Sequence, residues 1–291
     1  MPPLTASPVR RAGARVRRTV LRAVPGARMT PDFLIIGTKR GGSTSLFDYL
    51  IQHPDVLPPY VAKGSRYFDV HHDRGPRWFR SHFPRTAAAR AHQRRTGHPP
   101  VTGEASPYIV FHPLSAGWIA SELPDARLVV ALRDPVERAW SHHRYEVARG
   151  TEPLDISAAL DAEPARLAGE VERLVRDPSY RSTPHRNWSY LARGRYAEQL
   201  RHLWAFVPRE QVLVLASEHL FADPEGAMNR VASFLDLRPY RLLDSSPSKA
   251  NTAAGMPAPV RRRLTEYYAG PNEDLFALLG ERYPWSAGTG E

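Results

Sequence analysis

Residues 33–46, Phe-Leu-Ile-Ile-Gly-Thr-Lys-Arg-Gly-Gly-Ser-Thr-Ser-Leu, restrict the possible folds of this chain more than any other stretch. The four leading apolar residues, two of them β-branched, predict a buried strand over 33–36. A glycine-rich turn follows, and hydroxyl residues then open a predicted helix over 45–52, which ends near Pro54. A strand, a glycine loop and a helix N-terminus together form an anion cradle, because backbone N–H groups and the helix dipole favour negative charge there.

The cations of this loop are placed differently from those of a nucleoside-triphosphate loop. In that motif a Lys directly follows the last Gly, whereas here Ser43 follows Gly42. The two cations instead precede the glycines. The loop is therefore predicted to bind a nucleotide phosphate other than the terminal phosphates of ATP. The residues predicted to form this cradle are Lys39, Arg40, Gly41, Gly42, Ser43, Thr44 and Ser45.

A second candidate phosphate site follows the next clearly buried apolar run of the chain. Asp134 suits an N-cap, Pro135 suits the first helical position and Glu137 completes a capping-box pattern, so a helix is predicted to start here. Arg133 then lies at the carboxyl end of a strand, where open α/β sheets bind ligands, and its guanidinium can grip a phosphate with two hydrogen bonds. Ser141 lies on the same predicted helix. The alternative is that Arg133 forms only a surface ion pair with Asp134 or Glu137.

Buried strands alternate with helices along the chain. This alternation predicts one α/β domain over 31–291, with a central parallel sheet and helices on both faces. Residues 84–100 are predicted to be an exposed excursion, and 150–190 a lid or insertion. The strands are expected over 33–36, 101–104, 127–132 and 211–216, and the helices over 45–52, 74–83, 114–123, 135–149, 196–206, 224–235 and 259–268.

Composition narrows the class of protein further. The chain of 291 residues has no Cys, which excludes disulfides and thiolate nucleophiles and agrees with the cytoplasmic location that we expect. Residues 1–31 hold seven arginines and no acidic residue, so the rest carries only +3 of the formal charge of +10. We therefore expect no specific nucleic-acid partner. The basic arm over 1–30 is predicted to be disordered, and weak contact with an anionic membrane surface or a partner is the alternative.

These motifs resemble those of the sulfotransferase family, which uses 3′-phosphoadenosine-5′-phosphosulfate (PAPS). The likeness spans roughly residues 30–285 and is to the carbohydrate branch, typified by heparan-sulfate sulfotransferases and their bacterial relatives. It implies a P-loop-like fold in which the glycine loop binds the 5′-phosphosulfate end, while Arg133 and Ser141 bind the 3′-phosphate. Lys249, in Ser248-Lys249-Ala250-Asn251, partly matches a third nucleotide-binding loop. The implied product is 3′-phosphoadenosine-5′-phosphate (PAP), and no metal is required.

The chain departs from the family pattern at two catalytic positions. The usual catalytic Lys is Arg40 here, with Lys39 beside it, and we expect both to stabilise charge on the leaving phosphate. The usual base is a Glu, and its position is occupied by Gly64. Glu104 is the first candidate for a replacement base. Its alternative role is that of a structural acid paired with Lys39, Arg66 or another cation.

The resemblance implies an acceptor hydroxyl on a carbohydrate, a glycolipid or a glycosylated natural product. Segments 60–100 and 150–190 are expected to line its pocket, because they lie outside the donor motifs. Lys63 and Arg66 are candidates for holding an anionic acceptor or the sulfonate. Weaker candidates are two histidines as base and five aromatic residues that either stack on the acceptor or pack in the core: His71, His142, Trp78, Phe79, Phe111, Trp188 and Tyr190.

Two other functions remain open from the sequence. A P-loop nucleotide kinase or phosphotransferase would need a Lys after the glycines and an Asp at a strand end, and the strand ends here carry Gly37 and Arg133. A non-catalytic nucleotide-binding protein on the same scaffold is suggested by the missing Glu at Gly64.

Overall fold

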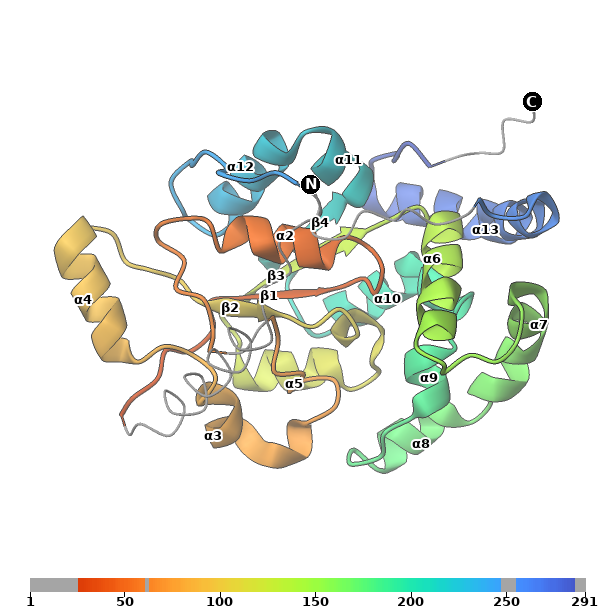
Figure 1. The fold of residues 1–291 in the computed structure, drawn as a ribbon. Helices are drawn as coiled ribbons and strands as arrows, with labels where there is room; N and C mark the ends of the chain where they lie inside the picture. Colours follow the sequence, from red (N-terminus) through yellow and green to blue (C-terminus); the bar gives the residue numbers. More distant parts are fainter. Residues whose placement is uncertain (1–25, 61–62, 247–254, 286–291) are drawn as a thin grey trace.

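A central parallel sheet organises the molecule, as the alternating pattern predicts. The computed structural model describes residues 26–60, 63–246 and 255–285. Its four strands are β1 (Phe33–Gly37), β2 (Gly103–Ala105), β3 (Arg127–Leu132) and β4 (Val212–Ala216), in the order β2-β1-β3-β4 (Figure 1). Phe33 lies opposite Gly103 on one side and Arg127 on the other, so all strands point the same way and their carboxyl ends meet at one edge.

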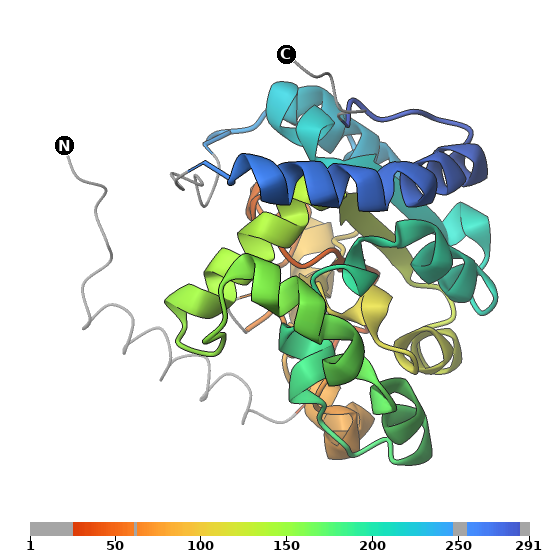
Figure 2. The same cartoon turned by 90° about the vertical axis from the view of Figure 1, so that its right-hand side faces the viewer.

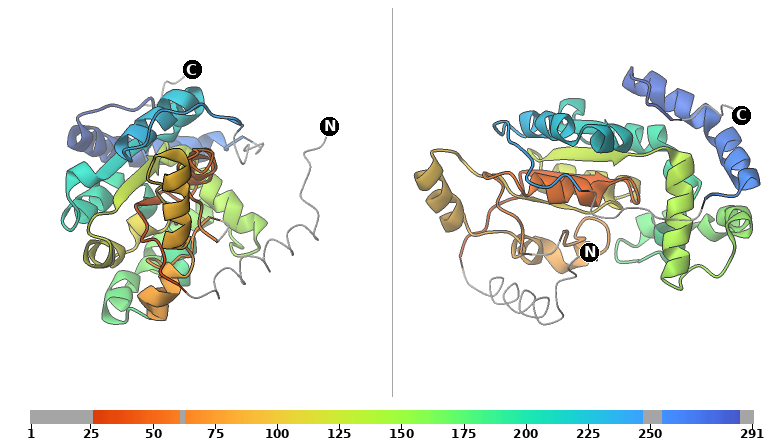
Figure 3. Two further views of the ribbon diagram at one scale, coloured as in Figure 1. Left: turned by 90° about the vertical axis from the view of Figure 1, so that its left-hand side faces the viewer. Right: turned by 45° about the horizontal axis from the view of Figure 1, so that its top comes forward.

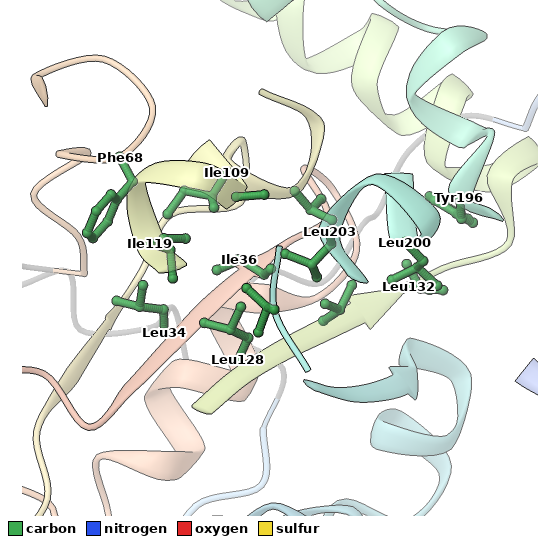
Figure 4. Close-up of a cluster of buried hydrophobic side chains, with 14 of the residues drawn as sticks. Leu34, Ile36, Phe68, Ile109, Ile119, Leu128, Leu132, Tyr196, Leu200 and Leu203 are labelled. Atoms are coloured by element: carbon green, nitrogen blue, oxygen red, sulfur yellow. The ribbon is translucent and has the colours of Figure 1, made fainter. Parts of the chain in front are cut away.

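Helices cover both faces of this sheet, and the alternation of side chains along β1 explains why. Leu34 and Ile36 belong to one buried cluster, whereas Phe33 and Ile35 belong to the other. The first cluster packs against α5 (Ser115–Glu122) and α10 (Tyr196–Trp204), as Figure 4 shows. The second packs against three helices: α2 (Ser43–Leu50), α11 (Ser217–Ala222) and α12 (Pro224–Phe234).

A group of helices stands beside the carboxyl edge of the sheet. The helix α6 starts at Pro135 as predicted, with the Asp134 side chain accepting a hydrogen bond from the Val136 N–H at 2.9 Å. A third buried cluster joins α6, α7 and α13, and Figure 2 shows α13 crossing over the two others. The bounds are α6 (Pro135–Ala148), α7 (Ile156–Leu167), α8 (Glu170–Arg176), α9 (Thr183–Asn187) and α13 (Ala258–Leu279).

The structure corrects the sequence prediction in two segments. Residues 84–100 are exposed as expected, but they contain the helix α4 (Thr86–Thr96), because alanines in its first turns favour helix. The last helix continues through Pro271 to Leu279 rather than ending near residue 268. The predicted helix over 74–83 is α3 (Gly75–Arg80). In the described ranges, none of the helices combines the length and the apolar character needed to cross a membrane.

Candidate active site

The carboxyl edge of the sheet forms one wall of a cavity of about 850 Å³. Its lining comes from the segments that follow all four strands, which is where parallel α/β sheets bind ligands. The loop after β1 contributes Lys39, Arg40 and 42–45, and the segment after β3 contributes Arg133. The two predicted phosphate sites therefore face a single cavity.

The glycine loop allows close backbone approach at the floor of this cavity. A Cβ on Gly41 would lie 2.7 Å from the Ala131 carbonyl oxygen, so only glycine fits beside β3. Gly42 has a φ of 82° and is the N-cap of α2, without a side-chain hydrogen bond to the first turn. Ser217 holds the loop from β4, donating to the Gly41 carbonyl at 2.5 Å. The result is a helix N-terminus that is open toward the cavity, as an anion cradle requires.

Two guanidinium groups, those of Arg40 and Arg133, line the cavity beside the glycine loop. Arg40 Nε donates to Ser141 Oγ at 3.0 Å, and its guanidinium lies 5.1 Å from the centre of the Tyr145 ring. Burial and the neighbouring charge of Arg133 lower the pKa of Arg40. Arg133 also lies 3.8 Å from Glu137, so the ion pair considered from the sequence exists alongside its place in the cavity wall. Neighbouring cations that repel each other favour an anion bound between them.

Of the cations that line the cavity, Lys39 has the pKa that is shifted furthest from its usual value. Its Nζ donates to Glu146 Oε1 at 2.6 Å and to the Arg186 carbonyl at 3.2 Å. Burial and the nearby charge of Arg193 lower the pKa of Lys39 to about 7, against the opposing effect of Glu146. The charge on this lysine therefore changes near neutral pH.

Lys63 links a distant segment to the start of α2. Its Nζ donates to Ser43 Oγ at 3.0 Å and to Thr44 Oγ1 at 2.8 Å, directly above the predicted anion cradle. From the sequence, Lys63 is expected only as a contact for an anionic acceptor or the sulfonate. Its position beside both hydroxyls adds another cation to the start of α2.

The other side of the cavity is lined by charged residues that the sequence patterns did not single out. Asp69 is buried, and burial raises its pKa; Arg66 Nε lies 3.5 Å from its Oδ1. Arg149 and Arg186 line the same side. Arg186 comes from α9, within the segment 150–190 that was expected to face the acceptor. No sequence pattern marks Asp69 as a site residue, because only the fold brings Arg149 and Arg186 to the cavity wall beside the local pair Arg66 and Asp69.

The structure shows why no carboxylate stands at position 64. A Cβ on Gly64 would lie 2.5 Å from the Ala105 carbonyl oxygen and 2.7 Å from Ser106 Oγ. Glu104 lies behind the cavity wall rather than in it: its side chain is fully buried, and its Oε2 accepts from the Ser65 N–H at 2.6 Å. Burial raises the pKa of Glu104 to about 7. Among the described residues Lys39 and Arg66 form ion pairs with Glu146 and Asp69 instead, and the hydrogen bond from the Ser65 N–H gives Glu104 a structural contact, so its role as a base stays a prediction.

The remaining sequence candidates lie outside the cavity wall. His142 is fully buried, and burial lowers its pKa well below the usual value. Lys249 lies outside the described residues. Across the described ranges, no three His, Asp or Glu side chains are grouped as a metal site would need. Ser141 does not line the cavity either: it is buried and contacts the wall residue Arg40 through a hydrogen bond. The other candidates that do not line the cavity are Gly41, His71, Trp78, Phe79, Phe111, Trp188 and Tyr190, of which Phe79 and Tyr190 pack in the core.

The glycine loop follows β1, and Arg133 follows the neighbouring parallel strand β3. This arrangement defines a class of α/β protein that can hold a nucleotide phosphate at the carboxyl edge of its sheet. The chain belongs to the sulfotransferase family, because the sulfotransferase domain matches residues 30–247. This confirms the family predicted from the motifs, whereas the bacterial branch remains a prediction.

Relatives of known activity agree with this assignment. The chain is 29% identical to human heparan sulfate glucosamine 3-O-sulfotransferase 6, covering 91% of this chain and 76% of that protein. It is 27% identical to human heparan sulfate glucosamine 3-O-sulfotransferase 3B1, covering 89% of this chain and 66% of that protein. A crystal structure of a sulfotransferase from Alicyclobacillus acidocaldarius superposes with a TM-score of 0.65 at 27% identity, covering 88% of this chain and 98% of that one.

Proposed function

We propose that this protein transfers a sulfuryl group from PAPS to a hydroxyl group of a glycan or of another glycosylated acceptor. The observation that carries the proposal is the single cavity that holds the glycine loop at the end of β1 and Arg133 at the end of β3. PAPS carries anionic groups at both ends of its adenosine, so two separated cradles suit it. The heparan sulfate sulfotransferases among the relatives support a carbohydrate acceptor.

The proposed transfer is an in-line displacement at sulfur. The acceptor oxygen forms a bond to sulfur while the bond from sulfur to the 5′-phosphate oxygen breaks, and the phosphate leaves with the electron pair. Arg40 and Lys39 then face the charge that develops on the leaving phosphate. Lys63, at the start of α2, adds a third positive charge on the same side.

The acceptor proton needs a base on the other side of the cavity. Asp69 is the carboxylate that we propose, because it lines the cavity beside Arg66, whose Nε lies 3.5 Å from its Oδ1. Its raised pKa suits a group that must take up a proton. Glu104 is better placed to hold the segment around Ser65 through its hydrogen bond to that N–H.

Removal of Arg133 is expected to weaken the binding of PAP. Losing one charge-assisted phosphate contact costs about 1.5–3 kcal/mol, roughly 10-fold to 150-fold in affinity. The measurement is calorimetric titration of the Arg133→Ala variant with PAP, beside the wild type. Ser141→Ala is expected to weaken PAP binding less than Arg133→Ala, because serine carries no charge. Part of its effect should come from Arg40, whose Nε loses its hydrogen-bond acceptor.

The same titration tests the proposed function. Wild-type protein should bind PAP and not ATP with Mg²⁺. The variant Arg90→Ala, at an exposed position of α4 outside the cavity wall, should bind PAP as tightly as the wild type. Binding of ATP alone would overturn the proposal in favour of a phosphotransferase. Unchanged PAP affinity in both Arg133→Ala and Ser141→Ala would remove the second phosphate site.

The lowered pKa of Lys39 predicts a fall in kcat/KM as the pH rises through about 7. A lysine is charged below its pKa, so the cation that faces the leaving phosphate is present at lower pH and lost at higher pH. The measurement is the pH profile of kcat/KM for the donor in the wild type and in Lys39→Arg. The arginine keeps its charge, so this fall should disappear from its profile. Identical profiles for the two proteins would show that Lys39 does not carry the titration.

A further inference from the structure

Lysine is rare in this chain. Of the 40 Lys and Arg residues only three are lysines, at positions 39, 63 and 249. Lys39 and Lys63 both line the cavity. Arginine keeps its charge throughout the physiological pH range, whereas a buried lysine can lose its proton near neutral pH. A chain that uses arginine at almost every other basic position therefore places two titratable cations in its candidate active site.

A buried arginine stands behind Lys39. Arg193, in the 3₁₀ turn Ala192–Gly194, is fully buried and is not one of the residues that line the cavity. Its Nη2 donates to the Arg186 carbonyl at 3.0 Å, and Lys39 Nζ donates to the same oxygen at 3.2 Å. The two cations are therefore close neighbours, one facing the cavity and the other behind its wall.

No carboxylate among the described residues lies within ion-pair distance of Arg193. Its other hydrogen bonds go to uncharged groups, the His185 carbonyl and the Ser189 hydroxyl, each 2.9 Å from Nη2. The ring centres of Tyr108 and Phe111 lie 5.0 and 4.6 Å from its guanidinium carbon. Its Nη1 is buried and has no hydrogen-bond partner in the described part of the chain. Burying a cation without a paired carboxylate costs folding free energy, which suggests a function for this charge.

The carboxylate that faces Lys39 is shared among several groups. Glu146 Oε1 accepts from Lys39 at 2.6 Å, while Arg149 lies 3.7 Å from its Oε2. Thr151 donates to the same Oε2 at 2.7 Å. His142 Nε2 lies 3.5 Å from Oε1, but burial and the charge of Lys39 lower the pKa of this histidine well below its usual value, so it is neutral. Glu146 therefore offsets only part of the positive charge around Lys39.

The other charged groups that act on Lys39 are cations. After burial, the charge of Arg193 is the largest cause of its lowered pKa, and Arg186 acts in the same direction. Burial lowers the pKa of Arg193 to about 9, so this arginine still carries its charge at neutral pH. On α6 the centre of the Tyr145 ring lies 5.7 Å from Lys39 Nζ. Figure 1 and the right-hand view of Figure 3 show α6 and α9 next to each other at this end of the sheet.

We propose that Arg193 is a positioning residue of the active site, which supplies a fixed positive charge behind Lys39 and holds the Arg186 carbonyl that Lys39 contacts. This inference rests on the proposed function, in which Lys39 faces the leaving phosphate. In the free protein, repulsion between the two cations favours release of the Lys39 proton. A phosphate bound in the cavity offsets that repulsion, so donor binding restores the charge on Lys39. The charge of this lysine is thereby coupled to the occupancy of the donor site.

The test is an NMR titration of Lys39 in the full chain labelled with isotope-enriched lysine. Only three lysines need to be resolved, and Lys39→Arg assigns the signal. The wild type should titrate with a midpoint at a pH of about 7. Arg193→Met removes the neighbouring charge, so Lys39 should hold its proton to higher pH and its midpoint should rise by about one pH unit. Saturating PAP should raise the midpoint in the wild type.

Arg193→Lys is the matched control, because it keeps the charge but loses the fork of hydrogen bonds. Its Lys39 midpoint should stay close to that of the wild type, while the fall in kcat/KM in Arg193→Met should move to higher pH together with the NMR midpoint. If Arg193→Met does not fold, Arg193→Gln carries the same expectation, since its neutral amide can still donate to a backbone carbonyl. A purely structural Arg193 would change stability or activity without moving the Lys39 midpoint, and that outcome would overturn the proposal.

The response to PAP separates this inference from the proposed function. PAP that binds without raising the Lys39 midpoint would overturn the coupling and leave the proposed function intact. Absence of PAP binding would overturn the proposed function, while the midpoints of the wild type and the Arg193 variants would still decide whether Arg193 sets the charge on Lys39. A wild-type midpoint at a pH of about 10, the ordinary value for lysine, would overturn the inference directly.

Discussion

Replacing Arg40 with Ala is expected to lower kcat for sulfuryl transfer by about 10²–10³-fold, the cost of removing one preorganised group that meets transition-state charge. Arg40 lies in the cavity wall with a φ of 71°, an unusual conformation for a residue other than glycine. Its contact with Ser141 Oγ and its position against Tyr145 fix the guanidinium in place. This side chain therefore needs little reorganisation when the leaving phosphate gains charge.

Steady-state kinetics with separate values of kcat and KM for the donor are the measurement. Arg40→Lys is the matched control, because it keeps the charge but cannot form the same contact from Nε, and we expect an intermediate rate. A variant Arg40→Ala with unchanged kcat and a raised KM would show that Arg40 only binds the donor.

Replacing Glu163 with Ala is expected to lower the free energy of unfolding by roughly 3–5 kcal/mol. The buried carboxylate accepts three backbone N–H groups: its Oε2 from Tyr190 and Leu191 at 2.8 and 2.7 Å, and its Oε1 from Ala192 at 2.8 Å. These bonds join α7 to the turn that follows α9. Without the carboxylate the buried Tyr190 N–H and the part-buried N–H groups of Leu191 and Ala192 lose their acceptor, and each unsatisfied buried group costs free energy.

Denaturant unfolding followed by circular dichroism measures this loss. Glu163→Gln is the control, since its amide oxygen can still accept hydrogen bonds while its amide nitrogen cannot, and we expect an intermediate stability. Equal stability of Glu163→Ala and the wild type would mean that the turn around residue 191 finds other acceptors.

The sequence carries enough information to predict the sheet and to place the glycine loop and Arg133 at its carboxyl edge, because both depend on local patterns. The apolar run 127–132 forms β3 with the predicted bounds, since a strand buried on both faces shows as a continuous apolar run. Asp134 caps α6 as predicted because a cap depends only on residues within one turn. The glycine loop is predicted from the same kinds of local signal, namely an apolar strand before it and a helix start after it.

The acceptor side could not be predicted in this way. Asp69 and Arg186 are 117 positions apart and line the cavity together only because the chain folds. Glu104 follows a pattern that suits a base, but β2 is so deeply buried that its side chain lies behind the wall. The close packing of Gly64 against Ala105 also has no sequence signal, since it depends on how one loop lies over the end of a strand.

Helix α6 contacts both cations that follow β1. Ser141 accepts from Arg40 and Glu146 accepts from Lys39, and these two positions are about 7.5 Å apart along one helix. A rigid helix cannot move one contact without moving the other, so Arg40 and Lys39 form a single mechanical unit. The free-energy effects of substitutions at Ser141 and Glu146 are then expected to be coupled rather than additive. A tilt of α6, which packs against α13, would therefore move both contacts together and, in the proposed reaction, change donor binding and the charge near the leaving group at the same time.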